Sequence, residues 1–322
     1  MRTWRWLGAM LVLCAASSAL AQGAYPSKPV RLIVPFPPGG AVDYYARAVQ
    51  NRLAETLGQP ILIENRSGAS GMVGADLVAK SPPDGYTVLV GNIASLAMNV
   101  GLYSKMPYDP VKDLTPIMRT VAVDYAMVVH PSVPARTVAE FVAYAKANPG
   151  KMSYGSAGSG SAPHLSTELF KQRAGIDIVH IPFKGGGPMV TDLLGGQIQM
   201  VIADQANLMP HVKAGRLRAL AVGTLVRSAV YPEIPTIAES GYPGFEARAW
   251  QGIAGPAGMP PDVVKQLQAA IAKVMAMPDV RTRLVEGGLD PIVSSPEEFG
   301  EFIRAEIAKW SKVAKDVGAR VD

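Results

Sequence analysis

Two glycine-rich stretches of this chain combine residue types that suit the binding of a small anion. Residues 37–40 follow an apolar run over 30–36, and residues 155–161 follow a shorter run over 151–154. A helical pattern comes after each stretch, so each predicts a strand, a tight turn and a helix N-terminus. The first turn of a helix has unpaired N–H groups and partial positive charge, which favour anions. Together they predict a clamp that closes on a small carboxylate.

The first stretch offers backbone donors, and a carboxylate follows it closely. Gly39 and Gly40 let a ligand approach the backbone, while the two prolines before them restrict the turn. Asp43 lies in the first turn of the predicted helix, where it caps and offsets the dipole. Alternatively, Asp43 orients the loop or accepts a hydrogen bond from a ligand ammonium. Arg47, one turn further on, is expected to pair with Asp43 rather than with ligand.

The second stretch adds hydroxyl groups to flexible backbone. Ser156, Ser159 and Ser161 lie just before or at the start of the helix that residues 162–163 open. The alternative is a tight connection between a strand and a helix with no ligand. A phosphate loop is disfavoured, because no Lys-Ser or Lys-Thr pair follows the glycines. His164 has two interpretations: a structural hydrogen bond at the helix start, or a place in the cleft lining.

Further polar candidates follow other predicted strands. Lys184 and Gly185 come after the run 176–181, and Lys184 either adds charge for a second carboxylate or is a solvated loop residue. Asp204 ends the run 199–203, where an acid favours ligands that carry an amine, hydroxyl or amide. Asn92 and Ser95 follow the run 87–90. Ligands of open α/β sheets bind at the carboxyl ends of strands, which is where these residues lie.

Several kinds of catalytic site are disfavoured. No G-x-S-x-G motif marks a nucleophile elbow, and the histidines at 130, 164, 180 and 211 lack the spacing of zinc ligands. Cys14, the one cysteine, lies in the predicted leader, which excludes a thiol nucleophile in the mature chain. We therefore expect no enzyme activity, no metal and no cofactor.

These residues must be positioned by alternating strands and helices, which indicates an α/β fold. The predicted strands are the runs 30–35, 61–64, 87–90, 118–129, 176–181, 199–203 and 218–223. Clear helices are predicted over 42–57, from the capping box at Thr137 to residue 147, and over 188–194, 261–275 and 296–313.

The N-terminus reads as an export leader. Arg2 and Arg5 precede an apolar run over 7–16, and Ala19-Leu20-Ala21 forms an A-x-A cleavage site. A retained signal anchor is the alternative, but the run is short for a membrane span. The net charge of +5 falls to +3 without the two arginines, and no basic cluster suggests nucleic acid. The mature chain is expected in the periplasm, as a monomer.

Two long strand-like runs suggest how the domains are connected. Residues 115–130 and 245–253 are the runs long enough to pass from one domain to another. If both cross, residues 123–248 form a domain inserted into one built from 22–122 and 249–322, after a signal peptide over 1–21. The two glycine-rich stretches then face each other across a cleft, with hinges at 120–124 and 246–251.

Many motifs resemble one known family. The segment 25–40 with Asp43, Ala46 and Arg47 is similar to the opening of the tripartite tricarboxylate transporter receptors, called the Bug family. The resemblance continues over residues 64–71, 81–87, 180–186, 193–197 and 218–222, in order along nearly the whole mature chain. Residues around Asp43 and after Asp204 depart from common family spellings, so the ligand cannot be transferred from a relative.

This resemblance implies a two-domain α/β periplasmic binding protein fold, type II-like, with a hinge of two crossing strands and a ligand cleft between the domains. It also implies that a small organic anion is delivered to integral membrane transporter subunits, and that its carboxylate lies between a first loop (residues 36–43) and a second loop (residues 156–164). With the polar candidates above, the expected ligand-binding residues are Phe36, Pro38, Gly39, Gly40, Asp43, Asn92, Ser95, Ser156, Ala157, Gly158, Ser159, Gly160, Ser161, His164, Lys184, Gly185 and Asp204.

Two rival functions remain open at this point. The same clamp could act as a sensor that presents its closed form to a sensor kinase. A periplasmic hydrolase or transferase on this fold is the other rival, disfavoured by the missing catalytic motifs. The solute itself, whether a dicarboxylate, tricarboxylate, amino acid or aromatic acid, is not determined by the sequence.

Overall fold

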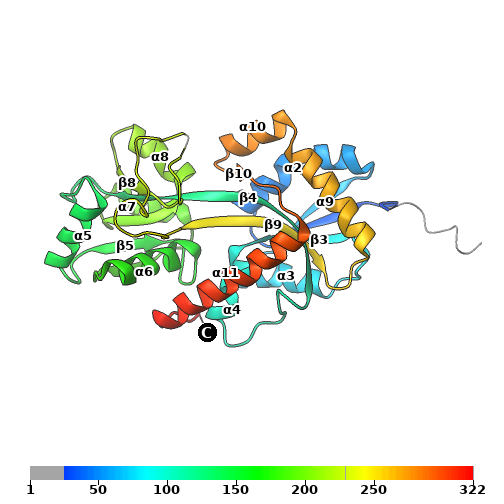
Figure 1. Cartoon of the computed structure of the whole chain (residues 1–322), viewed down its shortest axis with the longest axis horizontal. Coiled ribbons are helices and arrows are strands. Elements are labelled where there is room, and N and C mark those ends of the chain that lie inside the picture. The colour runs from blue at the N-terminus through cyan, green and yellow to red at the C-terminus, as the bar shows by residue number, and fades with distance from the viewer. Residues whose placement is uncertain (1–24, 229, 322) are drawn as a thin grey trace, which may run out of the picture.

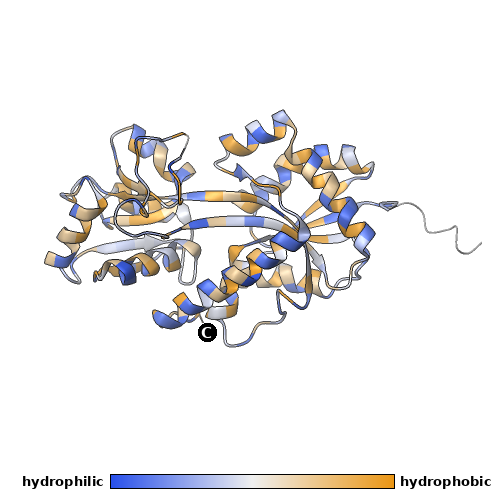
Figure 2. Ribbon diagram, viewed as in Figure 1, coloured by the Kyte–Doolittle hydropathy of each residue, from blue (hydrophilic) through white to orange (hydrophobic). Residues whose placement is uncertain are grey.

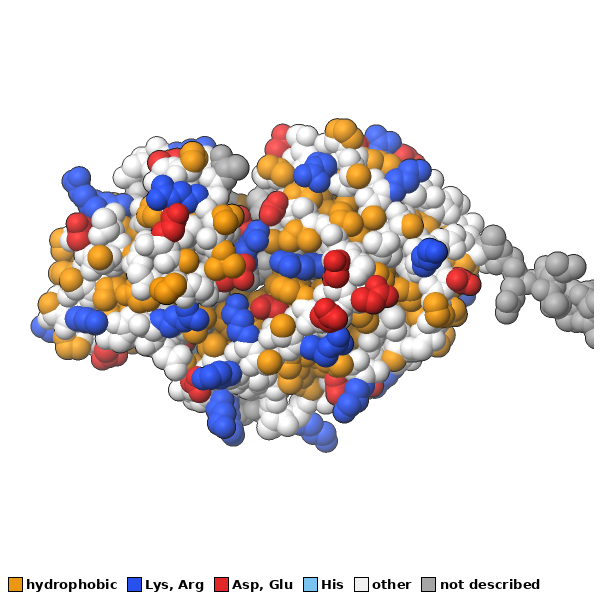
Figure 3. Space-filling model, in the orientation of Figure 1, with side chains coloured by type: hydrophobic (Ala, Val, Ile, Leu, Met, Phe, Trp, Pro, Cys, Tyr) orange, Lys and Arg blue, Asp and Glu red, His pale blue; other side chains and the backbone are white. Residues whose placement is uncertain are grey.

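The computed structural model describes residues 25–228 and 230–321. The predicted leader, with Cys14 and the cleavage site, lies outside these described residues. No helix within them is both long and apolar enough to cross a membrane. Basic and acidic side chains are interspersed on the face shown in Figure 3, which is hollowed at the top between the two ends of the molecule.

The strands form one continuous mixed sheet. Its main path runs in the order β2-β1-β3-β9-β4-β7-β5-β6, and β8 and β10 pair with β4 outside this path. The pairs β1–β2, β1–β3, β5–β6 and β5–β7 are parallel. The strands are β1 (Val30–Val34), β2 (Ile61–Asn65), β3 (Thr87–Asn92), β4 (Leu114–Val129), β5 (Ser153–Ser156), β6 (Val179–Pro182), β7 (Met200–Asp204), β8 (Arg218–Val222), β9 (Arg248–Pro256) and β10 (Asp290–Pro291).

Helices pack on this sheet in two groups, one toward each end of the molecule, while the last helix, drawn in red, runs across the middle from the right-hand group toward the left-hand one (Figure 1). Their apolar residues form stripes along otherwise hydrophilic surfaces, as α9 and α11 show in Figure 2. The helices are α2 (Ala41–Leu57), α3 (Met72–Ala79), α4 (Asn99–Leu102), α5 (Val138–Ala147), α6 (Ala162–Ala174), α7 (Gly186–Leu194), α8 (Gln205–Lys213), α9 (Pro261–Met275), α10 (Pro278–Glu286) and α11 (Pro296–Asp316), with short η2 (Ala69–Gly71) and η3 (Ala94–Met98).

Strand β4 runs through the parts of the sheet that both helix groups cover. Its first part pairs with β9 up to the pair of Asp124 with Arg248, and from Tyr125 onward it pairs with β7 instead. Strand β9 also pairs with β3. The two long strands therefore run antiparallel between the groups, as Figure 1 shows. The run 115–130 is confirmed as strand β4, and the run 245–253 is confirmed as a strand only from Arg248, because β9 starts and ends three residues later than predicted.

One predicted strand is shorter than its sequence pattern suggested. The apolar run 176–181 forms a ladder only from Val179, although Ile176 and Ile178 are buried. The reason is the partner: β6 pairs with β5 alone, and that pairing begins at Ser153 with Val179. Residues before Val179 have no neighbouring strand to pair with. Their apolar side chains reflect burial alone, which the sequence pattern could not distinguish from a strand.

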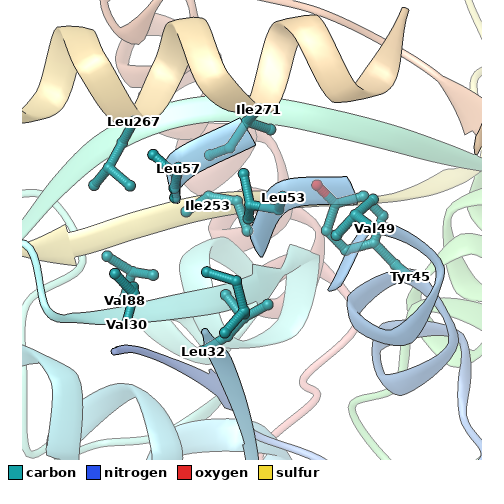
Figure 4. A pocket seen from close by; sticks show the side chains of 11 residues that line it. Val30, Leu32, Tyr45, Val49, Leu53, Leu57, Val88, Ile253, Leu267 and Ile271 are labelled. Atoms are coloured by element: carbon teal, nitrogen blue, oxygen red, sulfur yellow. The ribbon is translucent and has the colours of Figure 1, made fainter. Parts of the chain in front are cut away.

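The core between α2, α9 and the sheet is closely packed. Figure 4 shows side chains from α2, α9 and strands β1, β3 and β9 converging there. The space left between them is about 10 Å³, and ten of its eleven lining residues are aliphatic. This is about one water in size, and it lacks the polar partners that a bound water needs. It is a packing gap rather than a ligand site.

Candidate functional site

A cleft of about 800 Å³ brings the predicted site residues from both helix groups together. One side is lined by residues 36–42, 44, 92–94, 249–251 and 287–289, and the other by 157–163, 186–187, 189, 203–204 and 206–208. Eleven of the predicted residues line it: Phe36, Pro38, Gly39, Gly40, Asn92, Ala157, Gly158, Ser159, Gly160, Ser161 and Asp204.

The first loop exposes backbone donors to this cleft. Gly40 is the N-cap residue of α2 and has no side chain that could cap the helix. Within the described residues, we find no hydrogen bond from the N–H groups of Gly40, Ala41 or Val42. Gly39 has φ of +88°, a left-handed conformation that favours glycine. The turn therefore presents unpaired donors where the helix dipole is positive.

Asp43 supports the first loop from behind rather than lining the cleft. Its side chain is buried and accepts hydrogen bonds from the Gly39 N–H, Arg47 Nε and Asn65 Nδ2 at 2.8–3.0 Å. Burial works to raise the pKa of Asp43, but the hydrogen bonds from Arg47, Gly39 and Asn65 outweigh it, so the pKa is about 2. The carboxylate thus orients the loop, one of the roles considered from the sequence.

The second loop is held by a serine and two histidines. Ser156 Oγ lies 2.7 Å from His180 Nε2, and it also accepts from the Gly158 N–H at 3.2 Å. The rings of His180 and His164 stack with centroids 4.0 Å apart. His164 Nδ1 accepts from the Gly160 N–H at 3.1 Å. Neither Ser156 nor His164 lines the cleft; both fix the backbone of the loop that does.

Two backbone N–H groups of the second loop, those of Ser159 and Ala162, have no hydrogen-bond partner among the described residues and can bind a ligand. Ser159 is exposed in the cleft, whereas the hydroxyl of Ser161 caps α6 by accepting from the His164 N–H. In the part of the chain that the structure describes, no hydrogen bond occupies the N–H groups of Ser159 and Ala162. The two loops therefore present the same chemistry from opposite sides of one cleft: helix N-termini with unpaired backbone donors.

The histidine pair predicts a stability that depends on pH. Burial, and the neighbouring His164, lower the pKa of His180 from 6.5 to about 4, and burial also lowers the pKa of His164. The unfolded chain takes up the His180 proton near pH 6.5, while the folded chain resists until about pH 4. We expect melting temperature to be highest above pH 6.5 and to fall between 6.5 and 4.

Melting curves of His180→Gln provide the check, because glutamine does not titrate. Its melting temperature should fall less over this pH range than that of the wild type. His211→Gln, at a histidine on α8 outside the pair, should keep the wild-type slope. Equal slopes in all three proteins would show that the buried pair does not cause the acid sensitivity.

The remaining predicted residues have different positions. Ser95 is buried and exchanges hydrogen bonds with Asn92, so Ser95 fixes the side chain that lines the cleft. Lys184 is exposed outside the lining, and Gly185 precedes the two glycines of α7 that do line it. Asp204 ends β7 inside the lining. No group of three or more metal-ligating side chains occurs among the residues described.

Other lining residues were missed from the sequence. Tyr125 and Trp250 lie on the crossing strands β4 and β9, and their only signal was their place on those strands. Asn207 lies three residues after Asp204, so its position in the sequence could have placed it among the predicted ligand-binding residues. The loop 287–289 had no signal, because it reaches the cleft through contacts with distant residues: Gly287 packs against Tyr44 of α2 and Gly288 against Ala206 of α8.

Comparison with known proteins assigns the family. The model of the tripartite tricarboxylate transporter family receptor matches residues 45–319. The chain belongs to this family. BugT of Bordetella pertussis is 36% identical over 98% of this chain and 97% of its own length. The expected family resemblance is thus confirmed, and the family is one of solute receptors rather than enzymes.

Solved structures of relatives have the same fold. A Rhodopseudomonas palustris protein with adipate is 39% identical, with a TM-score of 0.82 over 92% of this chain and all of its own. MatC from the same organism, with bound malate, is 33% identical, with a TM-score of 0.77 over 90% of this chain and 99% of its own. The expected α/β periplasmic binding protein fold is confirmed by these structures.

Proposed function

We propose that this receptor captures a small carboxylate in the cleft and delivers it to the membrane subunits of a tripartite transporter. The observation that carries the proposal is the pair of helix N-termini, at Gly40 and Ser161, that open on one cleft. None of the described lining residues is a lysine, arginine or histidine. A carboxylate would be held by neutral, fixed dipoles, which lose little by reorganisation. The relatives that bind adipate and malate support this ligand class.

We further propose that the cleft closes about the crossing strands. Residues 22–122 with 249–322 would form one domain and residues 123–248 the other. The change in partners of β4 between Asp124 and Tyr125 supports a hinge at this place. The leader would be removed after Ala21, leaving a monomer in the periplasm, where transporters of this family take up their solutes.

The decisive experiment begins with the protein itself. Native mass spectrometry of the purified mature chain should detect a retained small acid, and calorimetry with that acid, adipate and malate should give its affinity. At a ligand concentration 100 times the dissociation constant, the free energy of unfolding should rise by about 2.7 kcal/mol. Uptake of the acid is then measured in cells that carry the transporter but lack this chain. Uptake should be lost if the chain delivers the acid and retained if the chain acts only as a sensor.

Closure has its own measurement. Small-angle scattering should show a smaller radius of gyration with saturating ligand, because the two loops lie on opposite sides of the cleft and must approach each other. An unchanged radius at saturation would contradict a clamp and favour a rigid pocket.

A further inference from the structure

Asp204 is electrostatically unusual in this cleft. Of the described lining residues it is the sole charged side chain. Across residues 25–228 and 230–321, we find no hydrogen bond or ion pair to its carboxylate, and this side chain does not cap α8. Burial raises the pKa of Asp204 to about 6, with no opposing charge nearby. The Asp204 side chain is partly exposed to the cleft, so this unpaired carboxylate, which is costly to ionise, can take a donor from the contents of the cleft.

The groups around Asp204 do not supply that donor. Tyr125 lies opposite Asp204 in the β4–β7 pair, and burial, followed by the charge of Asp204, raises the pKa of its hydroxyl. Asp124, the next residue of β4, lines a different pocket. On α8, which begins after Asp204, His211 and Lys213 lie in the last turn. The compensating group must therefore come from the contents of the cleft.

Topology places Asp204 close to the second loop. Strand β7 is parallel to β5, with Met200 paired to Tyr154, so Asp204 ends its strand level with the first residues of that loop. Neighbouring strands lie about 4.8 Å apart. A ligand of a few carbon atoms can thus place its carboxylate on the loop donors and still reach Asp204.

We propose that Asp204 sets the ligand class: the receptor prefers a carboxylate that also carries a protonated amine over one with a second carboxylate. This inference rests on the proposed function, because it assumes that the loops hold a carboxylate. An ammonium group would give Asp204 a charge-assisted hydrogen bond, whereas a second carboxylate would be repelled unless Asp204 took up a proton.

The test uses ligands of equal length that differ at one end. At each chain length from three to six carbons, calorimetry compares the ω-amino acid, the dicarboxylate and the plain fatty acid. At the best-bound length, the wild type should prefer the ω-amino acid by about tenfold or more. Asp204→Asn should remove most of that preference. Asp177→Asn, at an exposed aspartate outside the cleft, should leave it unchanged.

Melting and pH provide independent readouts. Asp204→Asn removes a desolvated charge, so the empty variant should melt at or above the wild-type temperature at pH 8, and this advantage should shrink as pH falls from about 6 towards 3.8. This result would also show that the variant folds. In the wild type, affinity for the ω-amino acid should rise between pH 5.5 and 7.5 as Asp204 ionises, and this rise should vanish in Asp204→Asn.

The outcomes separate the two proposals. If carboxylates bind but the dicarboxylate binds as well as the ω-amino acid, or Asp204→Asn leaves their ratio unchanged, this inference is wrong and the proposed function stands. If no member of the series binds and no acid is retained on purification, both are wrong.

Discussion

Gly40→Val should weaken carboxylate binding at least a hundredfold while the protein still folds. A valine side chain at the N-cap of α2 would cover the unpaired N–H groups that the first loop presents to the cleft. The backbone accepts the change: φ is −82° and ψ is 170°, an extended conformation that suits valine. An added Cβ would come no closer than 3.9 Å, to the Pro37 carbonyl oxygen. The loss of affinity would therefore report ligand access.

Gly195→Val is the matched control. Gly195 follows α7 outside the cleft lining, its φ is also −82°, and an added Cβ would lie 3.5 Å from the Thr191 carbonyl oxygen. Calorimetry should give wild-type affinity for this variant, and both variants should melt within a few degrees of the wild type. Wild-type affinity in a normally folded Gly40→Val protein would exclude the first loop from the site.

Local signals in the sequence predicted the frame of the site. The predicted helix over 42–57 ends where Gly58 adopts the left-handed conformation, and the helix predicted from residue 296 follows Ser295, which opens α11 with a complete capping box. The glycine turns at residues 37–40 and 155–161 lead into α2 and α6. Such features depend on residues three or four apart, which is the range that a sequence pattern describes well.

The inward or outward direction of side chains was harder to predict. Ser156 was expected to face ligand, yet it is fully buried against His180, a residue 24 positions away in the neighbouring strand. Tyr125 and Trp250 reach the cleft because strands β4 and β9 pass beside it. These positions depend on strand pairing between distant segments, which spacing along the chain does not specify.

Of the substitutions proposed here, Glu306→Ala should lower the free energy of unfolding the most. Glu306 on α11 is buried, and its Oε2 accepts hydrogen bonds from two indoles: Trp250 Nε1 at 2.8 Å and Trp310 Nε1 at 2.9 Å. Alanine would leave both buried donors without a partner, at about 1–3 kcal/mol each. We expect the free energy of unfolding to fall by about 2–6 kcal/mol, measured by urea denaturation.

The same experiment reports on the hinge region. Trp4 and Trp6 lie in the predicted leader, so Trp250 and Trp310 are the two tryptophans left in the mature chain. Their fluorescence should change in Glu306→Ala even before unfolding, because both indoles lose one shared acceptor. Trp250 also lines the cleft on crossing strand β9, so freeing it should weaken ligand binding as well.

Two variants on the same helix separate these effects. Glu306→Gln keeps an acceptor oxygen and should lose much less stability than the alanine variant. Glu301→Ala removes an exposed carboxylate from α11 and should change the free energy of unfolding by about 0.5 kcal/mol or less. If Glu306→Ala were no less stable than Glu301→Ala, the two indoles would have to find other partners, and α11 would not anchor β9 through this carboxylate. If Glu306→Ala kept its stability but bound ligand more weakly, the role of Glu306 would instead be to position Trp250 in the cleft.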